Sequence, residues 1–267
     1  MEPRFPGLDE EIINLGEFRR VGSLDKDAQQ IRLLCRENSA MHKKAARFMS
    51  AAAGLDEDSR RTASACFDKN KALNFARRMS AREFKPAHEK AGTLSKRFLS
   101  GITPDGLVTH YDTVALQCKR ITALEDEYGV CAPLIISELA HSAVCAGYDC
   151  TLCCCPLLPG KAEHLIIPEL SFCVTTANSF HMPPFAPERC IHASRFLDTA
   201  ALRAHRNRLA FNLKAQNDLL KEAVKILSAA KSVHDMIEEY YKAVMDFEGV
   251  SLKCEQLTAE LLGRAKH

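Results

Sequence analysis

Apolar residues recur at helical spacing in two long stretches of the chain, one on each side of a central region with a different pattern. The first stretch follows Ser23 and Asp25, either of which is a suitable helix N-cap. We expect Gly54 to end this helix, and a second helix over about 56–82 to pair with it as an antiparallel hairpin closed at Pro86. The apolar positions of the first helix approximate one face: Ile31, Leu34, Cys35, Met41, Ala45, Phe48 and Met49.

The end of the chain repeats the amphipathic pattern, which predicts a helix over 202–231 that continues through 236–249, and a short helix over 251–262. An offset of 178 residues places Ile13 on Ile191, Phe18 on Phe196 and Ala45 on Ala223 without a gap. The match predicts an internal duplication in which segments 13–53 and 191–231 share one geometry. Shared helical periodicity is the competing explanation.

The central region alternates short apolar strands with a helix, a pattern typical of α/β folds. We expect strands over 121–124, 150–155 and 172–176, and a helix over 133–146. The predicted fold class is therefore α/β, with a mainly parallel sheet over 98–190 flanked by long helical hairpins. Segment 1–97 would be a helical hairpin region with a basic linker, and 191–267 a second helical region.

A strand, a tight loop and a helix over 119–147 resemble the opening of a P-loop nucleotide-binding unit. That motif, G-x-x-x-x-G-K-[ST], cradles phosphates with backbone N–H groups, a Lys and a hydroxyl. Laid on this loop, its glycines fall on Asp126 and Cys131, its Lys on Ala132 and its Ser/Thr on Pro133. The sequence thus predicts a P-loop scaffold without a functioning motif. Its candidate phosphate-site positions are Asp126, Glu127, Gly129, Val130, Cys131, Ala132 and Pro133.

The flanking segments strengthen this interpretation. Residues 98–114 and 155–181, with the stretches HLIIPEL and DEEIINLGE, resemble a bacterial, Firmicutes-type ATPase-like family built from two tandem P-loop domains. The loop of that family reads G-E-P-G-T-G-K-S-T, so Glu127 and Gly129 keep their family identities. The resemblance implies ATP and Mg²⁺ as cofactors and a chain that lacks the first P-loop core, with 1–97 the remnant of the first repeat.

Net charge, apolar run lengths and cysteine content limit the classes of partner and the compartment that the sequence predicts. A net charge of +2 does not require an anionic partner, and the basic run over 69–97 is better explained as a solvated helix face than as a nucleic-acid site. No apolar run reaches the roughly 20 residues that span a bilayer, and the start has no leader pattern. We expect a cytoplasmic protein whose twelve cysteines are mostly reduced, buried thiols.

Other chemistry-bearing residues are weaker candidates. Cys150 and Cys153, with His164, have some zinc-site character, but alternate residues of a strand point to opposite faces, which favours buried thiols. Glu169 could hold Mg²⁺ through water, although a structural role is favoured. His141 and Ser142 have no third partner for a catalytic triad, and we assign no catalytic residue.

Three functions follow, in order of preference. The first is a catalytically compromised P-loop protein that acts as a structural or interaction protein, with a protein partner or a second copy bound through the helical hairpins. The second is an ATP-binding or ATP-hydrolysing member completed by a partner subunit. The third is a basic helical nucleic-acid binder.

Overall fold

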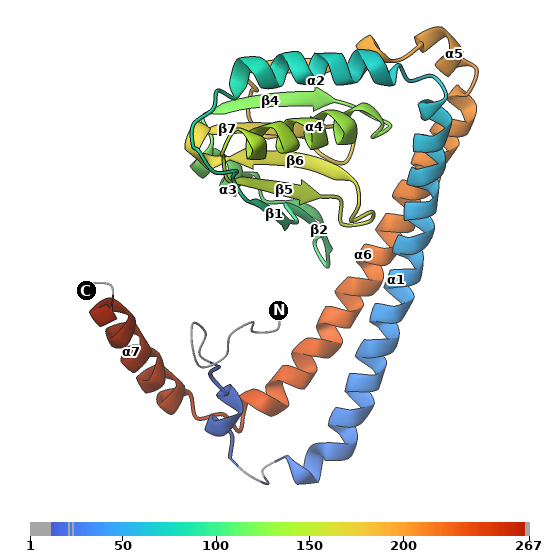
Figure 1. The fold of residues 1–267 in the computed structure, drawn as a ribbon. Helices are drawn as coiled ribbons and strands as arrows, with labels where there is room; N and C mark the ends of the chain where they lie inside the picture. The colour runs from blue at the N-terminus through green and yellow to red at the C-terminus, as the bar shows by residue number, and fades with distance from the viewer. Residues whose placement is uncertain (1–11, 21, 23, 265–267) are drawn as a thin grey trace. The chain divides into compact units, whose positions relative to one another are not determined.

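A computed structural model describes residues 12–20, 22 and 24–264 (Figure 1). The chain divides into two compact units, which we call the terminal unit (residues 1–41 and 229–267) and the central unit (residues 42–228). Within the described residues, no helix combines the length and the apolar character needed to cross a membrane.

The helices and strands lie in the following order. The helical elements are η1 (Leu15–Phe18), η2 (Asp25–Asp27), α1 (Ala28–Ser64), α2 (Lys69–Glu83), α3 (Tyr111–Gln117), α4 (Cys131–Cys145), η3 (Pro168–Leu170), η4 (Ala193–Phe196), α5 (Thr199–Arg203), α6 (Arg206–Lys242) and α7 (Phe247–Arg264). The strands are β1 (Leu94–Arg97), β2 (Ser100–Thr103), β3 (Gly106–Thr109), β4 (Arg120–Glu125), β5 (Cys150–Cys154), β6 (Ala162–Ile167), β7 (Phe172–Ala177) and β8 (Arg189–His192).

The central unit contains the predicted α/β sheet. Its strand order is β1-β5-β6-β7-β4-β8, and β2 and β3 form a separate antiparallel hairpin. The three predicted strands are confirmed as β5, β7 and β4, and the predicted helix as α4. The sheet is mostly parallel, as expected, but β6 runs antiparallel to both β5 and β7. Strands β1, β6 and β8 were not predicted.

Apolar side chains alternate between the two faces of this sheet and are buried on both. Leu165 and Val174 face α4, which packs on the sheet and on α2 (Figure 1). Ile166 and Cys173, their neighbours in sequence, face Tyr111 and other residues of α3. Burial on both faces explains why these strands read as continuous apolar runs rather than as alternating ones.

The expected end of the first helix at Gly54 is wrong. Helix α1 runs unbroken through Gly54, where the backbone keeps helical dihedrals and an added Cβ would meet open space. A glycine inside a helix costs only about 1 kcal/mol relative to alanine, which the surrounding helical residues outweigh. The predicted hairpin partner over 56–82 is therefore also wrong: its first part belongs to α1, and α2 packs on α4 instead.

The helix predicted over 236–249 is also corrected, because α6 ends at Lys242 and α7 begins at Phe247. These bounds agree with the 178-residue offset: α1 (Ala28–Ser64) shifts onto α6 (Arg206–Lys242), and η1 (Leu15–Phe18) onto η4 (Ala193–Phe196). The start of α2 at Lys69 shifts onto the start of α7. The boundaries of these elements therefore support the predicted duplication.

The hydrogen bonds that tie the helices together follow the same offset. In the central unit, Phe67 and Leu197 form an isolated antiparallel bridge, and the Asp68 N–H donates to the carbonyl of Phe196 at 2.8 Å. In the terminal unit, the equivalent bridge joins Arg19 to Met245, with a 2.7 Å bond from the N–H of residue 246 to the carbonyl of residue 18. We call this feature the repeat bridge. It occurs once in each unit.

Candidate functional site at the carboxyl end of the sheet

The predicted phosphate-site positions lie at the carboxyl end of β4, in the loop that leads into α4. Parallel pairing of β4 with β7 and β8 brings three chain segments to this edge: the 126–130 loop, the 178–181 turn after β7, and the end of β8. Ligand sites of open α/β sheets lie at such edges. The loop positions singled out in the sequence therefore lie at this edge of the sheet.

Asp126 occupies the helix N-terminus with its own carboxylate. Its side chain is 1% exposed, and Oδ2 accepts hydrogen bonds from the backbone N–H groups of Cys131 and Ala132, each at 2.7 Å. These are the first two residues of α4, and the third, Pro133, has no N–H. No backbone donor of the first three helical residues remains for an external anion.

This geometry decides whether a nucleotide phosphate fits the loop. A P-loop binds phosphate with the N–H groups that Asp126 already engages here. Ala132 supplies no ammonium and Pro133 no hydroxyl for Mg²⁺. The residues present do not fit Mg-ATP, because a phosphate would have to displace a buried carboxyl group that already engages both N–H donors.

The loop also contacts the side chain of Lys161, through Gly129. Gly129 has φ +61°, and a Cβ there would lie 2.7 Å from the Lys161 Cε and 2.8 Å from its Nζ. Any side chain would be strained by the dihedral and would also meet the lysine. Gly129 is therefore required by the packing of Lys161, which is 8% exposed.

Lys161, directly before β6, belongs to a buried charge network with residues from α1, β6 and the turn after β7. Its Nζ lies 3.1 Å from Asp56 Oδ2 and 3.6 Å from Glu163 Oε1, and His181 Nε2 lies 3.0 Å from Glu163 Oε2. Burial lowers the pKa of Lys161, but the carboxylates of Asp56 and Glu163 outweigh burial and the net shift is upward. Burial raises the pKa of Glu163, but His181 and Lys161 outweigh it and bring the value to about 2. The pair is ionised at neutral pH.

A β-bulge explains how this network forms. Cys153 pairs with His164 and Cys154 with Ala162, which leaves Glu163 as an extra residue on β6. His164, fully buried, contacts Thr175 Oγ1 through Nδ1 at 2.7 Å. Burial lowers the pKa of His164 to about 3, with a further lowering from His181. Sequence reasoning missed this network because strand alternation predicts that Glu163 and His164 diverge.

Glu127 and Asn178 hold the 178–181 turn against the loop. Glu127 Oε1 accepts from the Ser179 hydroxyl at 2.5 Å, and its Oε2 accepts from the Ser179 N–H at 3.2 Å. Asn178 Oδ1 accepts from the N–H groups of Phe180 and His181, each at 2.9 Å. Glu127 therefore positions protein backbone rather than a ligand.

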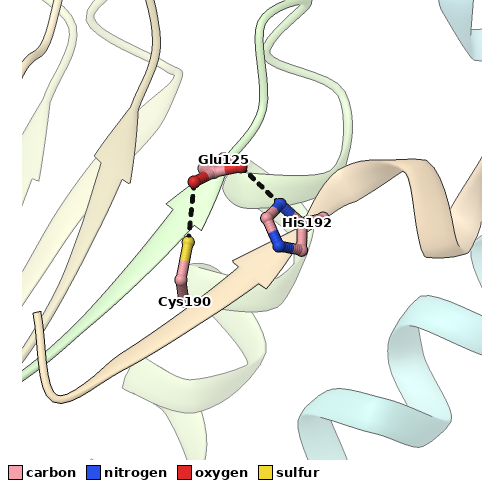
Figure 2. A group of neighbouring side chains, drawn as sticks. All are labelled: Glu125, Cys190 and His192. Carbon is pink, nitrogen blue, oxygen red and sulfur yellow. Dashed lines mark hydrogen bonds and ion pairs between the residues drawn. The ribbon is translucent and has the colours of Figure 1, made fainter.

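A second group of side chains lies beside the loop and was not predicted from sequence. Glu125, at the end of β4, contacts Cys190 Sγ at 2.9 Å through Oε1 and His192 Nδ1 through Oε2 (Figure 2). Burial and the hydrogen bond to Glu125 raise the pKa of Cys190 to about 11. The signal in the sequence was a Cys-x-His pair, which on a strand points to one face.

Glu125 and His192 also line a cavity of about 570 Å³ at this edge. Its wall combines the loop residues Asp126, Glu127 and Tyr128 with apolar residues that follow β7 and β8. A mixed polar and apolar concavity at the carboxyl edge of a sheet is typical of small-molecule sites.

The weaker sequence candidates lie elsewhere. Glu169 is in η3, at the opposite end of β7 from Asp126, where its carboxylate pairs with His88 Nε2 at 3.2 Å. A magnesium role beside the loop is therefore wrong for Glu169, and the structural role is favoured. The thiols of Cys150, Cys153 and Cys155 are buried and free, and burial raises the pKa of each. His141 is exposed on α4 and contacts Cys145 at 3.7 Å.

Comparison with known proteins adds no relative: no protein-family model, no curated protein and no solved structure matches this chain.

Proposed function

We propose that this chain is a P-loop-like protein that neither binds nor hydrolyses nucleotide and that acts as a structural or interaction subunit. The observation that carries the proposal is the position of Asp126, whose carboxylate accepts both N–H donors at the start of α4. The loop keeps the geometry that favours an anion at a helix N-terminus, and the chain supplies that anion itself.

The absent groups support the same conclusion. Phosphoryl transfer depends on positive charge and metal held beside the transferring group. Lys161, the lysine that contacts Gly129 of the loop, is neutralised by Asp56 and Glu163. Removing a single preorganised donor typically lowers a rate by about 10²–10³, and these losses act on one ligand and are not additive.

Helix α7 provides the interaction surface that we propose. At the 178-residue offset it corresponds to α2, whose apolar face is buried against α4. Among the described residues, the equivalent face of α7 is exposed or half-buried, because no α/β core covers it. The residues of α7 that correspond to the buried residues of α2 are Val250, Lys253, Cys254, Leu257 and Thr258, and the exposed Leu261 lies one turn further along.

The occupant that this equivalence implies is the α/β core of another protein, one that presents a helix like α4. A second copy of this chain fits less well, because its own α4 is already covered by α2. A reducing compartment such as the cytoplasm suits this protein, since all twelve cysteines are free thiols.

Calorimetry with Mg-ATP tests the nucleotide half of the proposal. The wild-type chain should give no binding heat, and Asp126→Asn, which keeps an acceptor oxygen at the helix start, should behave the same. The combined Asp126→Gly, Cys131→Gly, Ala132→Lys and Pro133→Ser chain should gain affinity. Micromolar binding by the wild type would overturn the proposal and favour an ATP-binding protein completed by a partner.

Sedimentation tests the interaction half. The purified chain should sediment as a monomer, because its proposed partner is a different protein. A dimer that Leu257→Arg dissociates, while the exposed control Glu255→Arg leaves it intact, would assign the α7 face to a second copy instead.

A further inference from the structure

The three side chains at the ends of β4 and β8 play no part in the proposed function, and their placement follows from strand geometry. In the parallel register of these strands, Ala123 lies opposite Cys190 and Glu125 opposite His192. Cys190 and His192 are two residues apart and share one face of β8, while Ile191 between them is buried on the other. The fold therefore directs a carboxylate, a thiol and an imidazole to one point (Figure 2).

The separations of the donor atoms suit a metal ion. One ligand atom from each residue lies within 4.8 Å of the other two. Zinc binds sulfur at about 2.3 Å and nitrogen or oxygen at about 2.0–2.2 Å, so tetrahedral ligands are roughly 3.3–3.8 Å apart. Small side-chain rotations about the present hydrogen bonds would bring the three atoms to these distances.

We propose that Glu125, Cys190 and His192 form a three-ligand site for Zn²⁺ that opens onto the adjoining cavity. Thiolate and imidazole select a borderline-soft ion such as zinc over Mg²⁺ or Ca²⁺, which require oxygen ligands. Three protein ligands leave a fourth position for water or a ligand group. Glu125 and His192 line the cavity of about 570 Å³, so that position is accessible from it.

Two other groups of donors within the described residues are poorer metal sites. Glu163, His164 and His181 also converge, but the Lys161 ammonium lies 3.6 Å from Glu163 and already supplies a cation. The group on α6, formed by His234, Asp235 and Glu238, lacks a thiol and consists of neighbours on one helix. Of these three groups of described residues, the one at β4 and β8 offers both sulfur and an exposed approach.

Titration of the full chain with Co²⁺, a spectroscopic substitute for Zn²⁺, tests the site. One equivalent should bind and give a sulfur-to-cobalt charge-transfer absorption, with the thiol proton released to solvent. Zn²⁺ should then displace the cobalt. Cys190→Ser should abolish the charge-transfer band. His192→Ala should weaken metal binding by at least about 100-fold, because loss of a residue that only hydrogen-bonds to a metal ligand weakens binding by up to about 100-fold.

Matched variants separate this site from the other cysteines and from the buried network. Cys254→Ser and Cys145→Ser remove exposed thiols elsewhere and should leave the spectrum unchanged. The absence of a charge-transfer band in the folded wild type would overturn the proposal, as would a band that persists in Cys190→Ser. Binding that survives Cys190→Ser but disappears in His181→Gln would place the ion at the buried network and also overturn it.

Discussion

The terminal and central units contain the same helical framework around different contents. Both have a short 3-10 helix and a repeat bridge related by one offset, and the 37-residue helices α1 and α6 each contribute residues to both units. The central unit adds a six-stranded sheet beneath α2, while the described residues of the terminal unit include no strand beneath α7. The 3-10 helix and the repeat bridge therefore form both beside the sheet and in a unit whose described residues include no sheet.

The burial of the equivalent helices α2 and α7, in contrast, depends on whether the sheet and α4 pack against them. Met79 in α2 is 3% exposed against α4, whereas its equivalent in α7, Leu257, is half-buried. Both side chains are large and apolar, so their different environments come from their neighbours and not from their own chemistry. Substitutions at such paired positions measure the contribution of the sheet directly.

The largest expected effect is at this pair. Met79→Ala should destabilise the protein by about 2–5 kcal/mol, because it removes transfer free energy and leaves a cavity between α2 and α4. Leu257→Ala should cost much less, since the site is partly hydrated already. Urea unfolding followed by circular dichroism measures both. Equal losses at the two positions would show that α7 is covered in solution.

The second prediction concerns acid, because the buried charge network exists only in the central unit among the described residues. His164 stays neutral down to a pKa of about 3 when folded, whereas its unfolded value is 6.5. As pH falls from 6.5 toward 3, only the unfolded chain gains this proton, so stability falls by about 1.4 kcal/mol per pH unit. Glu163 adds a similar loss as pH falls from 4.5 toward its folded pKa of about 2.

The groups around His164 are consistent with its lowered pKa and so with a loss of stability in acid. The ring faces His181 at 5.2 Å and Tyr111 at 6.1 Å between centroids, with Thr175 on Nδ1 and Glu163 nearby. Glu163 is engaged by Lys161, so it offers His164 little compensation. Between pH 6.5 and 5, the wild type should lose on the order of 2 kcal/mol.

Urea midpoints at these two pH values check the acid prediction. His164→Leu should largely remove the pH dependence in this window, and His141→Leu, an exposed control on α4, should not. Hydrogen exchange should show the central unit opening first. An unchanged slope in His164→Leu would assign the acid sensitivity to other groups.

Much of the central fold was predictable from sequence, since the apolar runs of β4, β5 and β7 and the amphipathic α4 need no tertiary information. Strand β6 was missed because its bulge at Glu163 and its antiparallel course depend on pairing partners. The predicted helix end at Gly54 was wrong because a helix continues through a glycine when the residues on both sides are helical. The loop position of Asp126 was predicted, but its capping role required coordinates, as did the meeting of Glu125 with residues from β8.

The smallest expected effect is at the helix caps that the units share. Asp68 Oδ1 accepts from the Lys71 N–H at 2.9 Å, and Asp246 Oδ1 accepts from the Gly249 N–H at 3.0 Å, one offset apart. Each Asp→Ala change should cost its helix about 1 kcal/mol, whereas Asp→Ser should keep the cap and most of the stability.

Loss of the two caps should differ in whether it lowers the stability of the whole protein or only of one helix. Helix α2 is packed on the core, so Asp68→Ala should lower the global unfolding midpoint. Helix α7 has no core beneath it among the described residues, so Asp246→Ala should mainly speed hydrogen exchange at the start of α7. The reverse pattern would mean that α7 is packed more tightly than α2. The contrast between a central unit with a core beneath α2 and a terminal unit without one beneath α7 would then have to be abandoned.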